Sequence, residues 1–519
     1  MLADGSHVFV VPGDITHLAA DAWLLPTDRT LHITEGWYRA VPHLRESVAR
    51  LGEAGSEFRA ERVKALVLPG WPEQEPQPVL VPVPFVGIRD AEQVVEPLTA
   101  ALRAAADPAR TRADRRPRSQ QRHLPLVAMP MFGSAGGGGD WLRGELLRRI
   151  LEVANAVGRE QGIDVVLVLR DAPDLARAHD IRRVDPYRTW AVLGEALVRQ
   201  AQDLAAKASA GQLVPFIGAG VSVSAGLPTW SDLLARLLDD SGLPRAEHDG
   251  FSKLDALDQA HVLRRLLTEQ GDSFNETVAR HVQAPRYGLA PAQLAALPTR
   301  EAVTLNYDTL YEKASQDMGH HLAVLPEEAV RPDGRWLLKL HGTVTRPDTI
   351  VLTREDYLGY GRGREALSAL AKAMLLTRHL LFVGFGLADD HFHELMHDVR
   401  EVLPTSVRGE GKLGTALLME PDALRTRLWG ADLDLVPMGG ADVPEQGRRL
   451  EIFLDCLLAH ADRGLHFFLD DRYRHRLTAP EQRLRGRLLG LTAEATPDER
   501  ATPAWAEVEA LLRSLGHRE

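Results

Sequence analysis

A glycine-flanked turn directly after a short apolar run constrains the fold of this chain more than any other feature. Residues 213–217 read Leu-Val-Pro-Phe-Ile, and Gly218-Ala-Gly220 follows them. Continuous apolar residues over this length are typical of a strand that is covered on both faces. Glycines after such a strand allow a tight turn and let the backbone approach a bound phosphate closely. The motif therefore predicts an open parallel sheet with a ligand at the carboxyl ends of its strands.

Apolar runs of strand length recur along the chain, separated by helical patterns. The expected strands are 7–11, 21–26, 65–69, 79–86, 125–131 and 164–169, then 213–217, 302–306, 336–341, 379–383, 415–419 and 433–438. Strands that alternate with helices predict the α/β class, here as two three-layer α/β domains.

A chain of 519 residues is too long for one ordinary domain. We expect a first α/β domain over residues 1–186 and a connecting helix over 187–211. A second α/β domain is expected over 212–462, and a helical C-terminal tail over 463–519. No internal repeat suggests another division.

Composition excludes several classes of protein. The only cysteine, Cys456, excludes a disulfide framework and a zinc site built on paired cysteines, so no metal is expected. No signal peptide or membrane span is found, which predicts a cytoplasmic protein. The net charge of −11 argues against non-specific nucleic-acid binding. The arginine-rich segment 103–122 is interpreted as a solvated loop, with a docking patch for a polyanion as the alternative.

The glycine turn belongs to a longer pattern, Gly-Ala-Gly-x-Ser followed by Gly226-Leu-Pro228. This pattern resembles the opening signature of the sirtuin (SIR2) family of NAD-binding proteins. The resemblance implies a Rossmann-like parallel sheet of sirtuin type over 212–462. It also implies cofactor contacts from Gly218, Ala219, Gly220, Ser222 and Gly226. The acidic–aromatic–arginine triplet that usually follows is replaced here by Thr229-Trp-Ser231.

Two further strand ends carry polar residues in the sirtuin order. Thr304-Leu-Asn-Tyr-Asp308 resembles the family's Thr-Gln-Asn-x-Asp element, and His341-Gly342 resembles its His-Gly. The resemblance implies that Asn306 positions the attacking water, that Asp308 receives the nicotinamide carboxamide, and that His341 is the general base. A histidine suits that role because its ordinary pKa is near neutrality. Taken alone, these residues would be an Asx turn and a structural histidine.

A fourth strand, 379–383, is followed by Gly384-Phe-Gly386 and Asp389. This segment resembles the family's Gly-x-Ser/Gly element, which contacts the adenosine half of NAD. Gly384 and Gly386 would bring the backbone to the cofactor. Asp389 would bind ribose hydroxyls, or else cap the next helix.

Family deacylases insert a four-cysteine zinc module after the catalytic histidine, and this chain has none there. Residues 347–357 resemble instead the SIR2-like proteins of bacterial antiphage defence, which are NAD glycohydrolases. The resemblance implies an NAD hydrolase whose acceptor is water. An NAD-dependent deacylase or ADP-ribosyltransferase is one alternative, and a non-enzymatic NAD or ADP-ribose sensor is another.

The N-terminal segment Gly13-Asp-Ile-Thr16 resembles the start of a macro domain, an ADP-ribose-binding module. The resemblance implies that Asp14 and Ile15 contact a nucleotide. A glycine-rich loop after the strand 125–131 is a candidate phosphate cradle. Its residues are Gly133, Ser134, Gly136 and Gly137. The macro Asn-Ala-Ala-Asn run is replaced by Pro26-Thr-Asp28, and the alternative is a structural or partner-docking domain.

For the whole chain we expect NAD as the substrate, an ADP-ribose-like or nucleotide ligand at the N-terminal domain, and a homo-oligomer. A defence partner protein is a further expectation.

Overall fold

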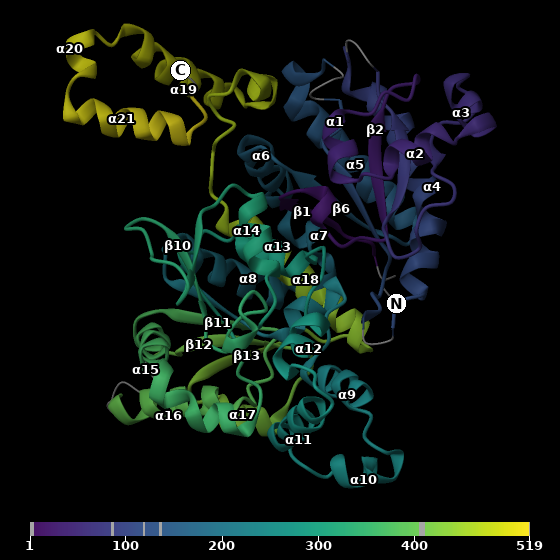
Figure 1. Cartoon of the computed structure of the whole chain (residues 1–519). Helices are drawn as coiled ribbons and strands as arrows, with labels where there is room; N and C mark the ends of the chain where they lie inside the picture. Colours follow the sequence, from purple (N-terminus) through teal and green to yellow (C-terminus); the bar gives the residue numbers. More distant parts are fainter. Residues whose placement is uncertain (1–4, 85–87, 118–119, 134–137, 404–410, 518–519) are drawn as a thin grey trace. The chain divides into compact units, whose positions relative to one another are not determined.

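The computed structural model describes residues 5–84, 88–117, 120–133, 138–403 and 411–517, and they form two compact units (Figure 1). Unit 1 is built from the chain up to Arg199 together with the C-terminal part from Asp455 onward. Unit 2 is built from Gln200–Leu454 and includes Gln120. Both units contain a largely or wholly parallel sheet, which confirms the α/β class.

Unit 1 holds a six-stranded sheet in the order β1-β6-β5-β2-β4-β3. The strands are β1 Val8–Pro12, β2 Ala22–Thr27, β3 Leu66–Val67, β4 Gln77–Pro82, β5 Leu126–Pro130 and β6 Asp164–Leu169. Only β3 pairs antiparallel, with β4, among the strands that the structure describes. The strands are almost entirely buried, as their continuous apolar sequences predict.

Two long helices cover one face of this sheet. They are α4 Val95–Asp114 and α5 Arg143–Gln161, and their apolar stripes share one core with the strands. Leu98, Ala101, Leu102 and Ala105 recur at helical spacing on α4 and are fully buried. The interpretation of the arginine-rich segment as a loop is therefore wrong up to Asp114. The alanines between the arginines make a helix face, which residue-type counting overlooked.

Shorter helices complete the N-terminal part of unit 1. They are α1 Glu35–Ala40, α2 Leu44–Ala49, α3 Gly52–Arg59, α6 Ala172–Arg183, α7 Pro186–Thr189 and α8 Gly194–Ser209, the last of which continues into unit 2.

The C-terminal segment packs on unit 1 through a small apolar cluster. Its helices are α19 Ala479–Glu494, α20 Pro497–Arg500 and α21 Pro503–Ser514 (Figure 1). Phe467, Leu469 and Tyr473 pack with Ala176 of α6. The segment therefore belongs to the same compact unit as the N-terminal sheet.

Unit 2 holds a seven-stranded parallel sheet in the order β13-β12-β11-β7-β8-β10-β9. The strands are β7 Leu213–Ile217, β8 Glu301–Thr304, β9 Leu322–Leu325, β10 Arg335–Lys339, β11 His379–Val383, β12 Gly414–Leu418 and β13 Leu433–Pro437. The strand β9 was not expected from the sequence. β8, β10 and β9 lie on one side of β7, and the later strands β11, β12 and β13 lie on the other. The topological switch point therefore lies between β7 and β11.

The register of this sheet aligns the strand ends that carry the sequence motifs. Ile217 pairs with Thr304 of β8 and with Val383 of β11. The residues that follow these strands therefore leave the sheet at the same level. A crevice at the carboxyl ends of the strands is the expected ligand site of such a sheet.

Unit 2 also contains helices in the segments that connect its strands. They are α9 Trp230–Ser241, α10 His248–Phe251, α11 Ala256–Glu269, α12 Phe274–His281, α13 Leu289–Ala296, α14 Leu310–Asp317, α15 Arg354–Thr377, α16 Asp390–Val402 and α17 Ala423–Trp429. The helices α9, α11 and α12 share a core of their own with Tyr307 and Leu352.

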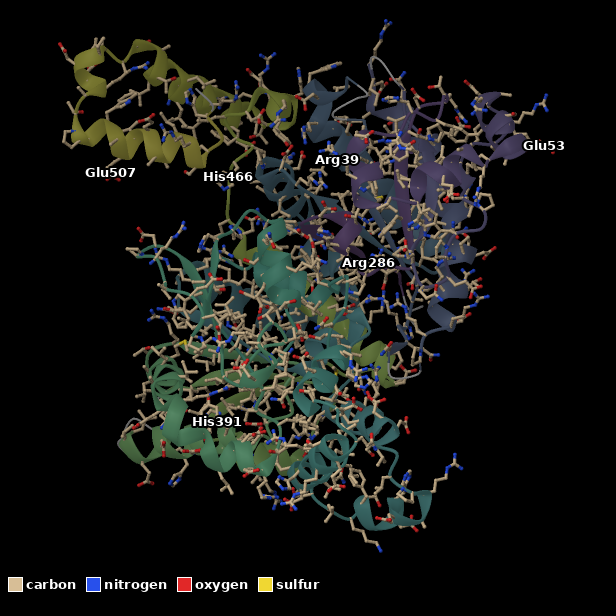
Figure 2. All side chains as sticks on the ribbon, in the orientation of Figure 1. Arg39, Glu53, Arg286, His391, His466 and Glu507 are labelled. Atoms are coloured by element: carbon tan, nitrogen blue, oxygen red, sulfur yellow. The ribbon has the colours of Figure 1, made fainter. Side chains whose placement is uncertain are left out.

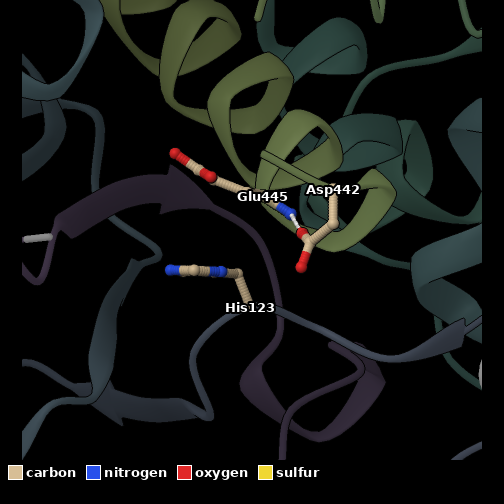
Figure 3. Close-up of side chains that lie close together, drawn as sticks. All are labelled: His123, Asp442 and Glu445. Carbon is tan, nitrogen blue, oxygen red and sulfur yellow. Dashed lines mark hydrogen bonds between the residues drawn. The ribbon is translucent and has the colours of Figure 1, made fainter. Parts of the chain in front are cut away.

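The last long helix, α18 Val443–Ala461, is shared by the two units. Asp442 begins it by accepting a hydrogen bond from the backbone nitrogen of Glu445 at 2.9 Å (Figure 3). Further along, Asp455 is completely buried and accepts hydrogen bonds from Trp190 Nε1 at 2.7 Å and from Arg182. It also lies 2.8 Å from His7 Nε2. This carboxylate ties the end of α18 to the first strand of the chain.

Among the described residues, no helix combines the length and the apolarity that crossing a membrane requires.

Candidate active site

A cavity of about 840 Å³ lies at the carboxyl ends of the unit 2 strands. It is lined by residues of the four loops that follow β7, β8, β10 and β11, together with residues of the helices α9, α11 and α15. The structure brings ten of the expected site residues together there: Gly218, Ala219, Gly220, Ser222, Asn306, Asp308, His341, Gly384, Gly386 and Asp389. Gly226 lies outside the lining. It ends the short helix Ala219–Ala225 with φ +90°, a conformation that favours glycine.

The glycines of the first and fourth motifs let two loops pack against each other. The backbone nitrogen of Gly220 donates to the carbonyl oxygen of Gly384 at 2.9 Å, and Gly218 donates to Val383. A Cβ atom on Gly218 would lie 2.4 Å from that Gly384 oxygen. Gly384 has φ +62°, and a Cβ there would lie 2.4 Å from the nitrogen of Val221. The amides of Gly218 and Gly220 are thus used within the protein, although the motif suggested that they bind phosphate.

A polar network fixes the second motif. Asn306 Nδ2 donates to the carbonyl oxygen of Gly218 at 3.1 Å and to Ser222 Oγ at 3.2 Å. Ser222 Oγ in turn donates to Asp308 Oδ2 at 2.8 Å, and Asp308 Oδ1 accepts from the nitrogen of Leu310 at 3.0 Å. Each side chain is therefore held in one orientation before any ligand binds. Such preorganisation is what positioning catalysis requires.

A buried lysine stabilises the loop that carries Asp308. Lys339, at the end of β10, is 2% exposed and donates to the carbonyl oxygen of Asp308. It also forms an ion pair with Glu312 at 2.7 Å. Burial raises the pKa of Glu312, against the lowering effect of Lys339. Sequence reasoning missed this pair because the two residues lie 27 positions apart and carry no motif.

His341 is buried in the cavity wall. Its Nε2 atom has no hydrogen-bond partner among the residues that the structure describes. Its ring stacks on that of His391, which lies on α16 and is labelled in Figure 2, with 5.7 Å between the centroids. His391 Nε2 lies 2.9 Å from Ser368 Oγ. Burial lowers the pKa of His341, while Asp389 opposes this shift. The imidazole is therefore neutral near pH 7, as a general base must be.

The segment 347–357 contributes two cavity residues that sequence reasoning did not identify as functional. Arg354 and Tyr357 come from the first turn of α15. Arg354 forms ion pairs with Asp255 and, at 2.5 Å, with Asp258. The stretch that stands in place of a zinc module thus forms part of the cavity wall.

Unit 1 has a cavity of its own, of about 950 Å³, which Asp14, Ile15 and Gly133 line. Asp14 Oδ1 accepts from Thr16 Oγ1 at 2.7 Å, and Oδ2 accepts from Arg170 at 2.5 Å. Arg143, another lining residue, forms ion pairs with Asp171 and Asp174. Arg39 of α1 also lines this cavity (Figure 2). Ser134, Gly136 and Gly137 lie outside the described residues.

Residues 300–435 match the family model of the SIR2-like domain. Unit 2 therefore contains a SIR2-like domain, as the motifs at its strand ends predicted. The matched range holds Asn306, Asp308 and His341.

The curated relatives include a defence-associated sirtuin and NAD(+) hydrolases. Defense-associated sirtuin 2 of Bacillus subtilis is 28% identical over 199 residues, which are 37% of this chain and 20% of the relative. NAD(+) hydrolase ThsA of Enterococcus faecium is 28% identical over 210 residues, which are 38% of this chain and 42% of the relative. NAD(+) hydrolase ThsA of Bacillus cereus (strain MSX-D12) is 26% identical over 198 residues, 36% of this chain and 39% of the relative. The matches thus cover less than half of each of these relatives.

Proposed function

We propose that this chain hydrolyses NAD to nicotinamide and ADP-ribose and serves as an NAD-depleting effector in bacterial antiphage defence. The observation that carries the proposal is the unpartnered Nε2 of His341 in the same cavity as the fixed Asn306–Ser222–Asp308 network. A buried polar atom without a partner is unfavourable, so a ligand that pairs with it is favoured there. The relatives named NAD(+) hydrolase support the same activity.

The cavity suits a dinucleotide in size and lining. Its volume of about 840 Å³ is at the upper end of small-molecule sites. The tight contact between the loops of Gly220 and Gly384 places backbone in the cavity wall, so an extended ligand can approach the main chain there. We assign Gly218, Ala219, Gly220, Ser222, Gly384 and Gly386 to cofactor contacts on this basis.

The reaction breaks the bond between the nicotinamide nitrogen and C1′ of the ribose. The electron pair of that bond returns to the pyridinium ring, so nicotinamide leaves neutral and the ribose becomes oxocarbenium-like. Asp308 accepts a hydrogen bond from the carboxamide and holds the ring, and Asn306 positions the water that attacks C1′. Little acid catalysis is needed, because the leaving group is neutral. Positioning and electrostatic support supply the catalysis.

His341 acts as the base of this site. Its neutral imidazole accepts a proton from a ribose hydroxyl or from the attacking water, and the proton passes to solvent as ADP-ribose forms. The sum is NAD⁺ and water giving nicotinamide, ADP-ribose and a proton. The buried position of His341 keeps the imidazole neutral before the reaction.

We further propose that unit 1 is a macro-like domain that binds an ADP-ribose-like or nucleotide ligand. Its cavity of about 950 Å³ combines the carboxylate of Asp14 with the guanidinium groups of Arg143 and Arg170. A carboxylate suits an adenine amino group and arginines suit a diphosphate. We also propose that the protein is a cytoplasmic homo-oligomer that acts with a defence partner protein. The proposed domain limits stay at residues 186, 211 and 462.

The test is nicotinamide release from NAD by the purified full chain, with and without an acyl-lysine peptide. Release that needs no peptide and is lost in Asn306→Ala and His341→Ala supports the hydrolase. The exposed His321→Ala is the matched control and keeps the activity. Release only with peptide would favour a deacylase instead. Calorimetric NAD binding without release in any condition would favour a sensor.

A further inference from the structure

A tyrosine–aspartate pair stands beside the candidate base. Tyr357 Oη donates to Asp389 Oδ2 at 2.5 Å. The other carboxylate oxygen, Oδ1, accepts from the backbone nitrogen of Phe392 at 3.1 Å and so caps α16. One donor on each oxygen fixes the plane of the carboxylate. Because each oxygen can accept two hydrogen bonds, acceptor capacity is left on the cavity side.

The pair is connected to His341 by direct packing. The Tyr357 and His341 rings meet edge to face, with 5.3 Å between centroids. Tyr357, Asp389 and His341 all line the cavity. The carboxylate of Asp389 also acts on the charge state of His341, since it raises the pKa of that imidazole against the effect of burial. Asp389 therefore belongs to the part of the cavity where His341 acts.

The chemistry of a fixed carboxylate limits what part of a dinucleotide it can accept. A carboxylate repels the diphosphate, so its partner must be a hydrogen-bond donor. Beside His341 the proposed function places the nicotinamide ribose, whose donors are its two hydroxyls. A carboxylate that accepts from such a hydroxyl forms a charge-assisted hydrogen bond, which is stronger than a neutral one.

We propose that Asp389 binds a hydroxyl of the nicotinamide ribose, rather than the adenosine half, and that Tyr357 is the positioning residue that aims its carboxylate. The inference rests on the proposed function, because it takes NAD as the ligand. It gives the stretch that stands in place of a zinc module a role in recognising the substrate. A helix cap alone would need neither Tyr357 nor a position in the cavity wall.

The experiment measures NAD binding to the full chain by calorimetry in an Asn306→Ala background, in which turnover is abolished. The probes are NAD, two analogues that lack the 2′- or the 3′-hydroxyl of the nicotinamide ribose, and one that lacks the 3′-hydroxyl of the adenosine ribose. We expect NAD to bind at least about tenfold more tightly than one of the nicotinamide-ribose analogues. Tyr357→Phe should reduce this ratio severalfold.

The matched control is Tyr360→Phe. Tyr360 lies on the same helix and also packs edge-on to His341, but its hydroxyl donates to the carbonyl oxygen of Leu340 at 2.9 Å. This variant should keep the ratio of the background protein. Asp389→Asn is the second test variant, because asparagine still caps a helix while the charge is removed. It should reduce the ratio at least as much as Tyr357→Phe.

An unchanged ratio in both Tyr357→Phe and Asp389→Asn would overturn the inference, as would discrimination only against the adenosine-ribose analogue. Absence of NAD binding would overturn it together with the proposed function. Nicotinamide release by the otherwise wild-type chain separates the two ideas. If nicotinamide is released but the affinity ratio is unaffected by the two variants, only the inference about Asp389 is overturned. If the affinity ratios change as expected but no nicotinamide is released, only the proposed hydrolysis is overturned.

Discussion

The hydroxyl of Ser222 lies 2.8 Å from a carboxylate oxygen of Asp308, which is 86 positions away in the sequence. The same hydroxyl oxygen accepts from Asn306 Nδ2. One small side chain therefore sets the orientation of both polar groups that the proposed mechanism uses. The serine of the glycine-rich motif thus orients the side chains of the second motif.

Replacing Ser222 by alanine should slow nicotinamide release by about 10- to 100-fold, because the lost hydrogen bonds are worth about 1–3 kcal/mol. The loss should appear in kcat, since Asn306 and Asp308 keep their side chains and lose only their positions. Steady-state kinetics measure it, with Ser252→Ala on the exposed surface as control. Unchanged kcat would show that Ser222 does not position these groups.

The pH dependence of the reaction should reflect the buried state of His341. Burial lowers the pKa of this imidazole from its ordinary value of 6.5. The neutral, active form then persists to lower pH, and the acidic limb of kcat/KM should lie below pH 6.5. Asp389→Asn should move the limb to still lower pH, because the carboxylate favours the protonated form. A limb at or above pH 6.5 in the wild-type protein would contradict this role for His341.

Gly384→Ala should destabilise unit 2. The residue has φ +62°, and an added Cβ would meet the backbone nitrogen of Val221 at 2.4 Å. The left-handed conformation alone costs an alanine about 1–2 kcal/mol, and the clash adds to it. Thermal unfolding measures the effect. Gly386→Ala in the same loop is the control for stability, because its Cβ would meet no atom within 4 Å. Equal melting temperatures for the two variants would refute the packing argument.

Asp455→Ala should destabilise unit 1 by about 3–5 kcal/mol, since it leaves the buried guanidinium of Arg182 without its partner. The paired arginine and histidine hold the pKa of Asp455 far below its usual value, although burial opposes them, so the carboxylate is charged at neutral pH. Chemical unfolding measures the loss. Asp107→Asn removes a carboxylate from an exposed ion pair with Arg110 and should change stability by less than about 0.5 kcal/mol. A similar small change in Asp455→Ala would contradict the argument.

Much of the architecture could be predicted because it depends on local patterns. Continuous apolar runs mark most strands of both sheets, and three of them, including Leu213–Ile217 and His379–Val383, coincide in both bounds with the observed strands. The motif residues at the strand ends meet in one cavity because parallel strands deliver their carboxyl ends to the same edge.

The parts that could not be predicted depend on contacts between distant residues. Lys339 and Glu312, or Tyr357 and Asp389, become pairs only when the fold brings them together. No spacing rule identifies a partner 27 or 32 positions away. The short strand Leu322–Leu325 was missed because a run of four residues is not distinctive. The C-terminal segment was not assigned to unit 1, since its cluster with Ala176 is a tertiary contact.

Two separate parts of the chain form unit 1, namely the part up to Arg199 and the part from Asp455 onward. A ribosome therefore synthesises all of unit 2 before the carboxylate that binds Arg182 and His7 exists. The strands of the first sheet are synthesised early, but the buried Arg182 of α6 and His7 before β1 gain their partner only with Asp455, more than 250 residues later. Completion of unit 1 therefore requires that unit 2 has already been synthesised, and a prematurely ended chain would carry an unneutralised arginine in the core of unit 1.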